Sequence, residues 1–172
     1  LFLLRGMPFV DLAFLRRCDL QGNVITYHRR KTSRKLTVGV GKEAMEIIQK
    51  YMYAIPDSPY LFPIIQNPGK DEYGQYARML RLQNYRLTQV ANILGIRDRL
   101  STYTARHTWA TTALRQNYNS SLICDAMGHS SVKVTETYFQ PYRDDEVNRM
   151  NSSLITYILS KKKRGTDKKI RS

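Results

Sequence analysis

Side chains able to act on a phosphate group gather in two short stretches of the sequence. Residues 102–111 contain Arg106 and His107, and residues 126–138 contain His129 and end at Tyr138, nine residues further on. Guanidinium groups stabilise the charge that develops on the oxygens of a phosphoryl transition state, and a deprotonated phenol can act as a nucleophile. This set of arginine, histidine and tyrosine side chains favours phosphodiester chemistry without a metal ion.

Other common kinds of site have weak support in the sequence. Residues 39–41 lack the third glycine of a phosphate-binding loop. The three histidines lie in unrelated segments, and neither cysteine belongs to a pair spaced for zinc. The composition alone leaves a Ser-His-Asp set open, but no nucleophile-elbow pattern supports one. We therefore expect neither a metal nor a cofactor.

Local patterns predict a mainly α-helical domain with one small three-stranded antiparallel sheet, an α+β fold. Residues 24–27 and 36–40 flank the basic segment 28–35 and predict a hairpin with a charged tip, to which residues 17–20 could add a strand. Residues 55–69 hold four prolines and predict a loop. Apolar periodicity predicts helices at 1–15 (broken at Gly6), 41–53, 72–94, 102–116 (capped by Ser101 or Thr102), 120–127, 132–139 and 144–159.

Charge points to a polyanionic partner. The chain has 172 residues and a net charge of +14, and much of the excess lies outside the basic segment 161–172. We expect that segment to be a disordered tail and residues 1–160 to be one domain. No apolar run approaches the roughly 20 residues of a membrane span, and no signal-peptide pattern is present. Two cysteines fit a reducing compartment, so we expect a cytoplasmic protein.

The two stretches together resemble the signature of the tyrosine recombinases, the phage integrase family. That signature is an Arg-His-Thr/Ser-aromatic-Ala-Thr helix, then Leu-Gly-His-Ser-Ser, then Thr-x-x-Tyr. The matching segments here are Arg106-His107-Thr108-Trp109-Ala110-Thr111, Met127-Gly128-His129-Ser130-Ser131 and Thr135-Glu136-Thr137-Tyr138.

Two further blocks extend the resemblance over residues 1–159. Arg5, in the segment Arg-Gly-Met-Pro-Phe-Val-Asp, lies where the family has its first catalytic arginine, and this variant is similar to integrases of Bacteroides-type mobile elements. Lys31 matches the family's hairpin lysine in position. The resemblance implies a recombinase catalytic domain, here a fragment that lacks the N-terminal core-binding domain.

The resemblance also implies the reaction. Tyr138 would attack the scissile phosphorus and form a 3′-phosphotyrosyl link with a free 5′-hydroxyl, so that religation needs neither metal nor ATP. Arg5 and Arg106 would bind the two non-bridging oxygens through planar, permanently charged groups. Lys31 would protonate the leaving 5′-oxygen, and His129 would bond a non-bridging oxygen or assist proton transfer at Tyr138.

Additional DNA-backbone contacts are expected from the basic hairpin, at Arg30, Arg34 and Lys35. Two other aromatic residues of the motifs have structural interpretations: Trp109 in the core and His107 as a buried structural donor. Tyr142, four residues after Tyr138, is the nearest alternative nucleophile.

One position departs from the family pattern. The usual motif is His-x-x-Arg, and here the residue three before Arg106 is Tyr103. A phenol can donate a hydrogen bond to phosphate, but with an ordinary pKa near 10 it carries no positive charge at neutral pH. We expect Tyr103 to be a secondary donor to the phosphate rather than a general acid or base.

Alternatives remain open for two of these residues. Arg106 could form a structural salt bridge with Asp125 or Glu136, and Lys35 could replace Lys31 as the proton donor.

The function implied by the resemblance is site-specific recombination of duplex DNA by an integrase of a mobile element, acting as a DNA-bound tetramer with no small-molecule substrate. Helix 144–159 would dock on a neighbouring subunit, or alternatively on its own domain. Two other functions remain: a type IB topoisomerase-like relaxing enzyme, and a non-catalytic DNA-binding module with a decayed site.

Overall fold

The computed structural model describes residues 1–138 and 144–169, apart from the side chains of residues 146 and 158–169. The chain divides into two compact units, Leu1–Phe139 and Gln140–Ser172. The predictions that concern Phe139, Pro141 and Tyr142 therefore lie outside the described residues.

The first unit contains the predicted antiparallel sheet, with strand order β1-β2-β3. Its strands are β1 (Leu20–Gln21), β2 (Val24–His28) and β3 (Lys35–Gly39). On the core face, Ile25 is paired with Val38 and Tyr27 with Leu36, and all four side chains are buried. This alternation of buried and exposed positions is the pattern that a half-buried hairpin requires, and it confirms the predicted hairpin.

The third strand is shorter than predicted. Residues Arg17–Asp19 form a 3-10 helix, η2, and only Leu20–Gln21 pair with β2. The Asp19 carboxylate accepts a hydrogen bond from the Arg16 backbone N–H at 2.7 Å, which closes a turn where a strand was expected.

The helices of the first unit follow the predicted order, but residues 2–4 form a 3-10 helix, η1, and α6 ends at Glu136, before its predicted end. They are η1 (Phe2–Leu4), α1 (Phe9–Ala13), α2 (Lys42–Tyr51), α3 (Glu72–Ile93), α4 (Thr104–Arg115), α5 (Ser120–Met127) and α6 (Val132–Glu136). Residues 55–69 form a loop, as predicted.

The start of α4 differs from the prediction. Its N-cap is Tyr103, which makes no side-chain capping bond. Ser101 and Thr104 instead bond within the preceding turn: the Thr104 hydroxyl accepts from the Ser101 N–H at 3.0 Å, and the Ser101 hydroxyl accepts from the Tyr103 N–H at 3.2 Å. This turn exposes the Tyr103 side chain at the beginning of the helix.

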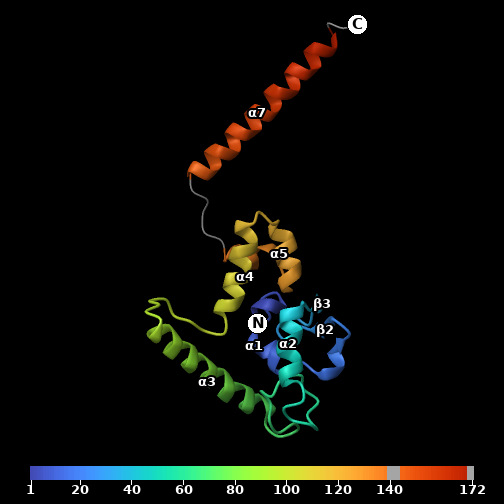
Figure 1. Cartoon of the computed structure of the whole chain (residues 1–172), viewed down its shortest axis with the longest axis vertical. Coiled ribbons are helices and arrows are strands. Elements are labelled where there is room, and N and C mark those ends of the chain that lie inside the picture. Colours follow the sequence, from blue (N-terminus) through green and yellow to red (C-terminus); the bar gives the residue numbers. More distant parts are fainter. Residues whose placement is uncertain (139–143, 170–172) are drawn as a thin grey trace. The chain divides into compact units, whose positions relative to one another are not determined.

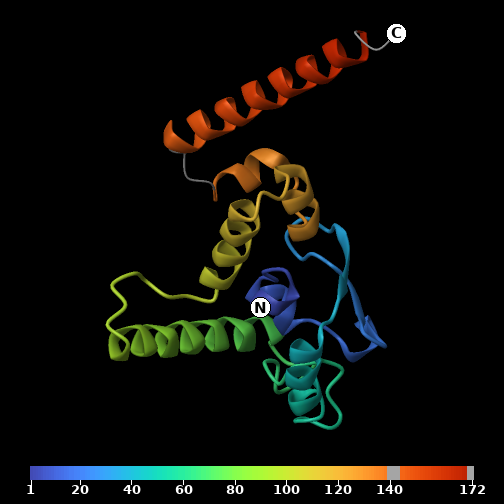
Figure 2. The same ribbon diagram turned by 45° about the horizontal axis from the view of Figure 1, so that its top comes forward.

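Two apolar clusters hold the first unit together. The larger packs the core face of the sheet with η1 and α2, and the smaller joins α4, α5 and Tyr138. Figures 1 and 2 show the β2–β3 hairpin reaching from the neighbourhood of α2 to α5, where Arg29, at the base of the hairpin tip, donates to the carbonyls of Met127 and Gly128. The hairpin therefore connects the two clusters.

The second unit is helix α7 (Asp144–Lys169), which continues past residue 159, its predicted end. The helix includes most of the basic segment that the sequence predicted as a disordered tail. Lysine and arginine have high helix propensity, so a charged segment can continue a helix. The side chains of Val147, Met150 and Leu154 are exposed.

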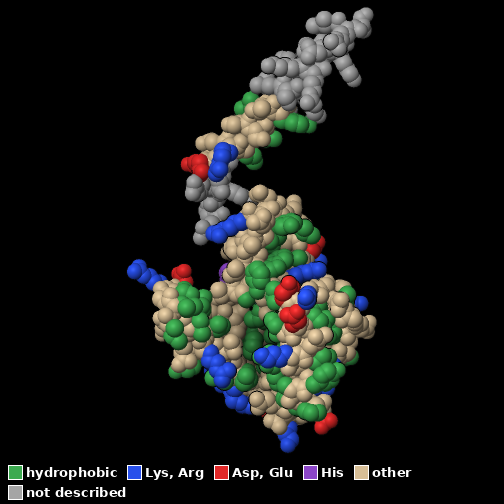
Figure 3. Space-filling view, in the orientation of Figure 1, with side chains coloured by type: hydrophobic (Ala, Val, Ile, Leu, Met, Phe, Trp, Pro, Cys, Tyr) green, Lys and Arg blue, Asp and Glu red, His purple; other side chains and the backbone are tan. Residues whose placement is uncertain are grey.

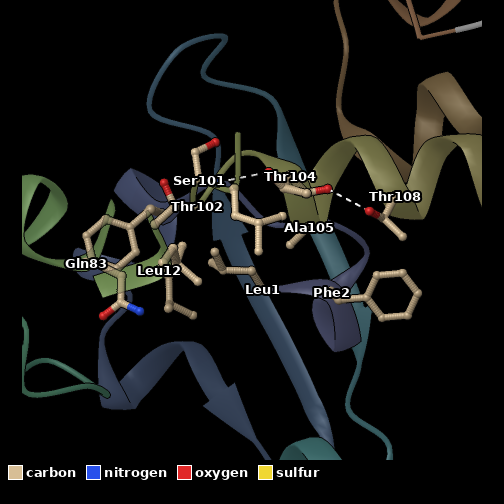
Figure 4. A pocket seen from close by; sticks show the side chains of 12 residues that line it. Leu1, Phe2, Leu12, Gln83, Ser101, Thr102, Thr104, Ala105 and Thr108 are labelled. Carbon is tan, nitrogen blue, oxygen red and sulfur yellow. Dashed lines mark hydrogen bonds between the residues drawn. The ribbon is translucent and has the colours of Figure 1, made fainter. Parts of the chain in front are cut away.

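An apolar cavity of about 550 Å³ lies between the N-terminal residues, α1, α3 and the start of α4. Figure 4 shows Leu1 and Leu12 at this cavity and the polar chain Ser101–Thr104–Thr108 along its edge, where the Thr108 hydroxyl donates to the Thr104 carbonyl at 2.9 Å. None of the predicted site residues lines it. Within the described ranges, no helix combines the length and apolar character needed to cross a membrane.

Candidate active site

The predicted site residues come from separate elements of the first unit. Arg5 follows η1, Lys31 lies in the hairpin tip, Tyr103 and Arg106 begin α4, His129 follows α5, and Tyr138 follows α6.

Arg106 is the buried centre of this group, with 2% of its surface exposed. Its guanidinium donates to the carbonyls of Gly6 and Met127, each at 2.8 Å, and to Nε2 of His129 at 2.7 Å. Within the described part of the chain no carboxylate pairs with it, so neither salt-bridge alternative, with Asp125 or with Glu136, is found. Burial, followed by the charge of Arg29, lowers the pKa of Arg106.

Gly6 has to be a glycine for Arg106 to lie where it does. Its φ is +65°, in the left-handed region, and a Cβ there would lie 3.0 Å from the Arg106 Cα. The close approach lets the Gly6 carbonyl accept from the guanidinium, and it brings the neighbouring Arg5 backbone beside α4.

His129 is buried between two polar partners. Its Nε2 faces Arg106, which can only donate, so Nε2 accepts and the ring proton belongs on Nδ1. Nδ1 then donates to the hydroxyl of the fully buried Thr135 at 2.7 Å. Burial and the nearby charges of Arg106, Arg29 and Lys31, in that order, lower the pKa of His129 to about 4. The imidazole is therefore neutral at pH 7.

Tyr138 packs on this histidine. The two rings are parallel within 2°, with centroids 5.6 Å apart, and 7% of the Tyr138 surface is exposed. Its hydroxyl is hydrogen-bonded to the hydroxyl of Tyr103. Burial first, and the Tyr103 hydroxyl second, raise the pKa of Tyr138 to about 12, while Arg106 acts in the opposite direction.

His107 differs from its prediction as a buried structural donor. It is exposed, and its ring meets the Tyr138 ring edge-on with centroids 4.5 Å apart. It also contacts the ring of Tyr103, at 5.0 Å. The ring of His107 thus lies against both tyrosines of the site, where the sequence had predicted a residue of the core.

The basic hairpin residues do not behave alike. Arg29 is buried, and its Nε pairs with the buried Asp11 carboxylate of α1 at 2.8 Å. Arg34 donates to the His129 carbonyl at 3.1 Å and to Asp125 at 2.8 Å. The Arg30 guanidinium lies over the Phe14 ring, 3.9 Å from its centroid.

Lys31 and Lys35 are exposed. Lys31 lies close enough to His129 for its charge to contribute to the lowered pKa of that histidine. Lys35 begins β3 and is paired across the sheet with His28, outside the tip. Of these two lysines, Lys31 is therefore the one that lies near the cluster around Arg106.

Arg5 is half-buried and has a φ of 55°, an uncommon backbone conformation for a residue other than glycine. Its Nη1 donates to the Thr37 carbonyl of β3 at 3.2 Å. It also lines a second apolar cavity, of about 640 Å³, together with Trp109 and Ile123. Arg5 thus borders the site through its backbone, while its side chain is directed to the sheet.

The sequence analysis assigned no role to two residues that shape the site, Asp11 and Thr135. Thr135 is the first residue of the Thr-x-x-Tyr segment, so the motif itself contained that signal. The pairing of Asp11 with Arg29 had no local signal, because the two residues lie on different elements. On the face shown in Figure 3, Lys and Arg side chains are scattered rather than gathered in one patch.

The chain is similar in sequence to known recombinases. Residues 4–144 match the sequence profile of the phage integrase family. A tyrosine recombinase of Pseudothermotoga lettingae is 24% identical over 121 residues, which cover 70% of this chain and 42% of that protein. The tyrosine recombinase XerC of Thermodesulfovibrio yellowstonii is 25% identical over 135 residues, covering 72% of this chain and 42% of that protein. The chain thus spans under half the length of these curated relatives.

Solved structures share the fold. The XerA recombinase superposes with a TM-score of 0.64 at 21% identity, covering 88% of this chain and 54% of that one. The Tn1549 transposon integrase, solved in complex with transposon right end DNA, gives a TM-score of 0.57 at 17% identity, covering 89% of this chain and 56% of that one.

Proposed function

Because this chain belongs to the phage integrase family, we propose that it is the catalytic domain of a site-specific recombinase that cleaves and rejoins duplex DNA through Tyr138. The observation that carries the proposal is the position of the Tyr138 phenol, parallel to the His129 ring, which is itself hydrogen-bonded to Arg106. A nucleophile, a neutral imidazole and a buried guanidinium therefore share one small region, as transfer of a phosphoryl group to a phenol requires.

The reaction begins with a protonated phenol. The raised pKa of Tyr138, about 12, means that a base must accept its proton as its oxygen bonds to phosphorus. In the free protein Nε2 of His129 already accepts from Arg106. A bound phosphate would compete for the Arg106 guanidinium, and Nε2 would then become available to accept the phenolic proton.

Cationic side chains would bind the charged phosphate oxygens and protonate the leaving group. Arg106 and Arg5 would bind the non-bridging oxygens, and for this the Arg5 side chain has to leave the Thr37 carbonyl, a partly exposed contact. As the bond from phosphorus to the 5′-oxygen breaks, Lys31 would donate the proton that produces a 5′-hydroxyl. Tyr103 would donate a hydrogen bond to the phosphate after releasing Tyr138.

Binding partners follow from the same proposal. We expect duplex DNA to be held through backbone contacts from residues such as Arg30 and Lys35, with an affinity that falls steeply with salt. The exposed apolar side chains of α7, including Val147 and Leu154, would be covered by a neighbouring copy in a DNA-bound tetramer. The protein would then act in the cytoplasm, at the DNA of a mobile element.

A nicked duplex tests the proposed nucleophile. The nick lies just downstream of the scissile phosphate, in DNA that flanks the gene, so that the cleaved fragment diffuses away and the covalent protein–DNA adduct accumulates. The full-length protein should form an adduct that survives denaturing electrophoresis, and Tyr138→Phe should form none. Tyr142→Phe is the matched control and should retain the adduct.

Three results would contradict the proposal. Equal adducts from wild type and Tyr138→Phe would identify another nucleophile. No adduct from either protein would favour a binding module. Relaxation of supercoiled DNA that lacks paired sites would favour the topoisomerase-like alternative.

A further inference from the structure

The tip of the β2–β3 hairpin is held against the end of α5 by several bonds. Residues 30–33 form the tip, and it is closed at its base by the Arg29 N–H, which donates to the Arg34 carbonyl at 2.9 Å. Within the tip, the Ser33 N–H donates to the Arg29 carbonyl at 2.8 Å. The turn that contains Lys31 therefore has a defined backbone conformation.

Both residues at the base of this turn reach toward the end of α5. Arg29 donates to the carbonyls of Met127 and Gly128. Arg34 donates to the next carbonyl, that of His129, at 3.1 Å, and pairs with Asp125 on the last turn of α5 at 2.8 Å. Three successive carbonyls thus accept from the two arginines that flank the tip.

These bonds favour a different role for Arg34 from the DNA-backbone contact that the sequence predicted. Its guanidinium already has two protein partners, and one of them is the backbone of His129. The bonds of Arg29 and Arg34 therefore fix the position of the hairpin relative to His129. Lys31 lies in the turn between these two arginines. A lysine on an unanchored tip would sample many positions, whereas proton donation needs one within hydrogen-bonding reach of the leaving oxygen.

We propose that Arg34, held by Asp125 and the His129 carbonyl, is a positioning residue that fixes Lys31 for protonation of the leaving 5′-oxygen. The inference rests on the proposed function, since it needs a leaving oxygen. It assigns no contact with DNA to Arg34. Arg29 acts in the same direction, but it is part of a buried ion pair, and its removal would threaten the fold.

The test replaces the leaving oxygen by sulfur. In a nicked substrate with a 5′-bridging phosphorothiolate, the leaving thiolate is a weak base and does not need a proton, because thiols ionise near pH 8.5. A variant that has lost only proton donation is therefore rescued by sulfur. A variant that has lost DNA binding, or its fold, is impaired on both substrates.

Arg34→Ala should reduce the rate of adduct formation on the oxygen substrate by about tenfold or more, a part of what general-acid catalysis contributes. On the sulfur substrate its rate should be close to wild type. Asp125→Ala should show the same pattern with a smaller loss, because Arg34 keeps its bond to the His129 carbonyl. Lys31→Ala, which removes the proton donor itself, should show the largest rescue.

Lys35→Ala is the matched control, because this neighbouring exposed cation is assigned to backbone binding. It should lower the rate on both substrates alike at subsaturating protein. In a salt titration of DNA binding, Lys35→Ala should reduce the slope by about one counterion contact, while Arg34→Ala should leave the slope unchanged.

The inference is overturned if Arg34→Ala is equally impaired on both substrates, if its salt slope falls as that of Lys35→Ala does, or if it matches wild type on both substrates. In each of these cases wild type still forms adducts through Tyr138, and the proposed function stands. If wild type forms no adduct on either substrate, the proposed function fails and the positioning role fails with it.

Discussion

The imidazole of His129 lies flat against the ring of Tyr138, with the two planes 2° apart. The stacked histidine is also bonded through Nε2 to Arg106 and through Nδ1 to Thr135. A ring held at both nitrogens has little freedom to rotate, so it offers the phenol a fixed surface. The geometry around Tyr138 is therefore determined by His129 as much as by the short helix α6 that precedes Tyr138.

Acid should destabilise the protein through His129. Its folded pKa is about 4, below the ordinary 6.5, so the unfolded chain binds a proton in this interval that the native state excludes. Stability is thus fully present above pH 6.5 and is lost as the pH falls toward 4, with a slope of at most about 1.4 kcal/mol per pH unit for one site.

Urea unfolding between pH 7 and pH 4.5 measures this contribution, with His129→Gln as the comparison. The variant should be less stable at pH 7, and its stability should fall less steeply with acid. Parallel curves for the two proteins would show that His129 does not exclude the proton.

Removing the Tyr103 hydroxyl should lower the pKa of Tyr138. The bond between the two phenols is the second cause of the raised value, and burial, the first cause, remains. In Tyr103→Phe we therefore expect a Tyr138 pKa that falls but stays above its ordinary value. Nuclear magnetic resonance of ¹³C-labelled tyrosine, followed against pH, measures the shift.

Tyr118→Phe is a suitable control for that titration, because Tyr118 is exposed and belongs to neither motif segment. It should leave the Tyr138 signal where it is in wild type. A Tyr138 midpoint that is the same in all three proteins would refute the coupling of the two hydroxyls.

Two glycines with the same backbone conformation separate strain from packing. Gly128 ends α5 with φ +64°, and a Cβ there would lie 2.8 Å from the Leu36 side chain. Gly95, after α3, has φ +65° and open space around it. Alanine at either position pays about 1–2 kcal/mol for the left-handed conformation, and only Gly128→Ala must also displace Leu36.

Urea unfolding should therefore show a larger loss of stability for Gly128→Ala than for Gly95→Ala. Equal losses would mean that Leu36 moves aside without cost. Adduct formation should fall only in the Gly128 variant, since Gly128 directly precedes His129.

Lysine should not replace Arg106. A lysine ammonium is a single point charge and cannot reproduce the planar fork that donates to Gly6, Met127 and His129. We expect Arg106→Lys to lose about 2–4 kcal/mol of stability, as for a broken buried network. The rate of adduct formation should fall by about 100-fold or more.

The comparison is Arg115→Lys, at the exposed end of the same helix, which should change stability by no more than about 0.5 kcal/mol. Urea unfolding and the nicked-substrate assay measure the two effects. Near-normal adduct formation by Arg106→Lys would contradict a bidentate role for Arg106.

Regular features of the fold were predictable because their signals are local. Alternating and β-branched residues identified β2 and β3, and Gly95 and Gly128 marked the ends of α3 and α5 correctly. The start of α4 was predicted two residues early. The sequence offers several hydroxyl side chains there, and which of them caps or closes a turn depends on the path of the preceding loop.

The fate of the basic hairpin residues was not predictable from the hairpin. Arg29 and Arg30 are neighbours of identical type, yet one is buried with Asp11 and the other lies over Phe14. Both partners come from the segment around α1, so tertiary packing decides which arginine is buried. The sequence motif identified Tyr138 and Arg106 but contained no information on this distinction.

The peptide oxygen of Met127 accepts from Arg29 and from Arg106, and Arg29 in turn is held by Asp11. Selection for inactive mutants should therefore recover Asp11 beside the residues of the motifs, even though its carboxylate lies in the protein interior. Suppressors of such mutants should cluster on α1 and the end of α5, where a new partner for the orphaned arginine can be supplied.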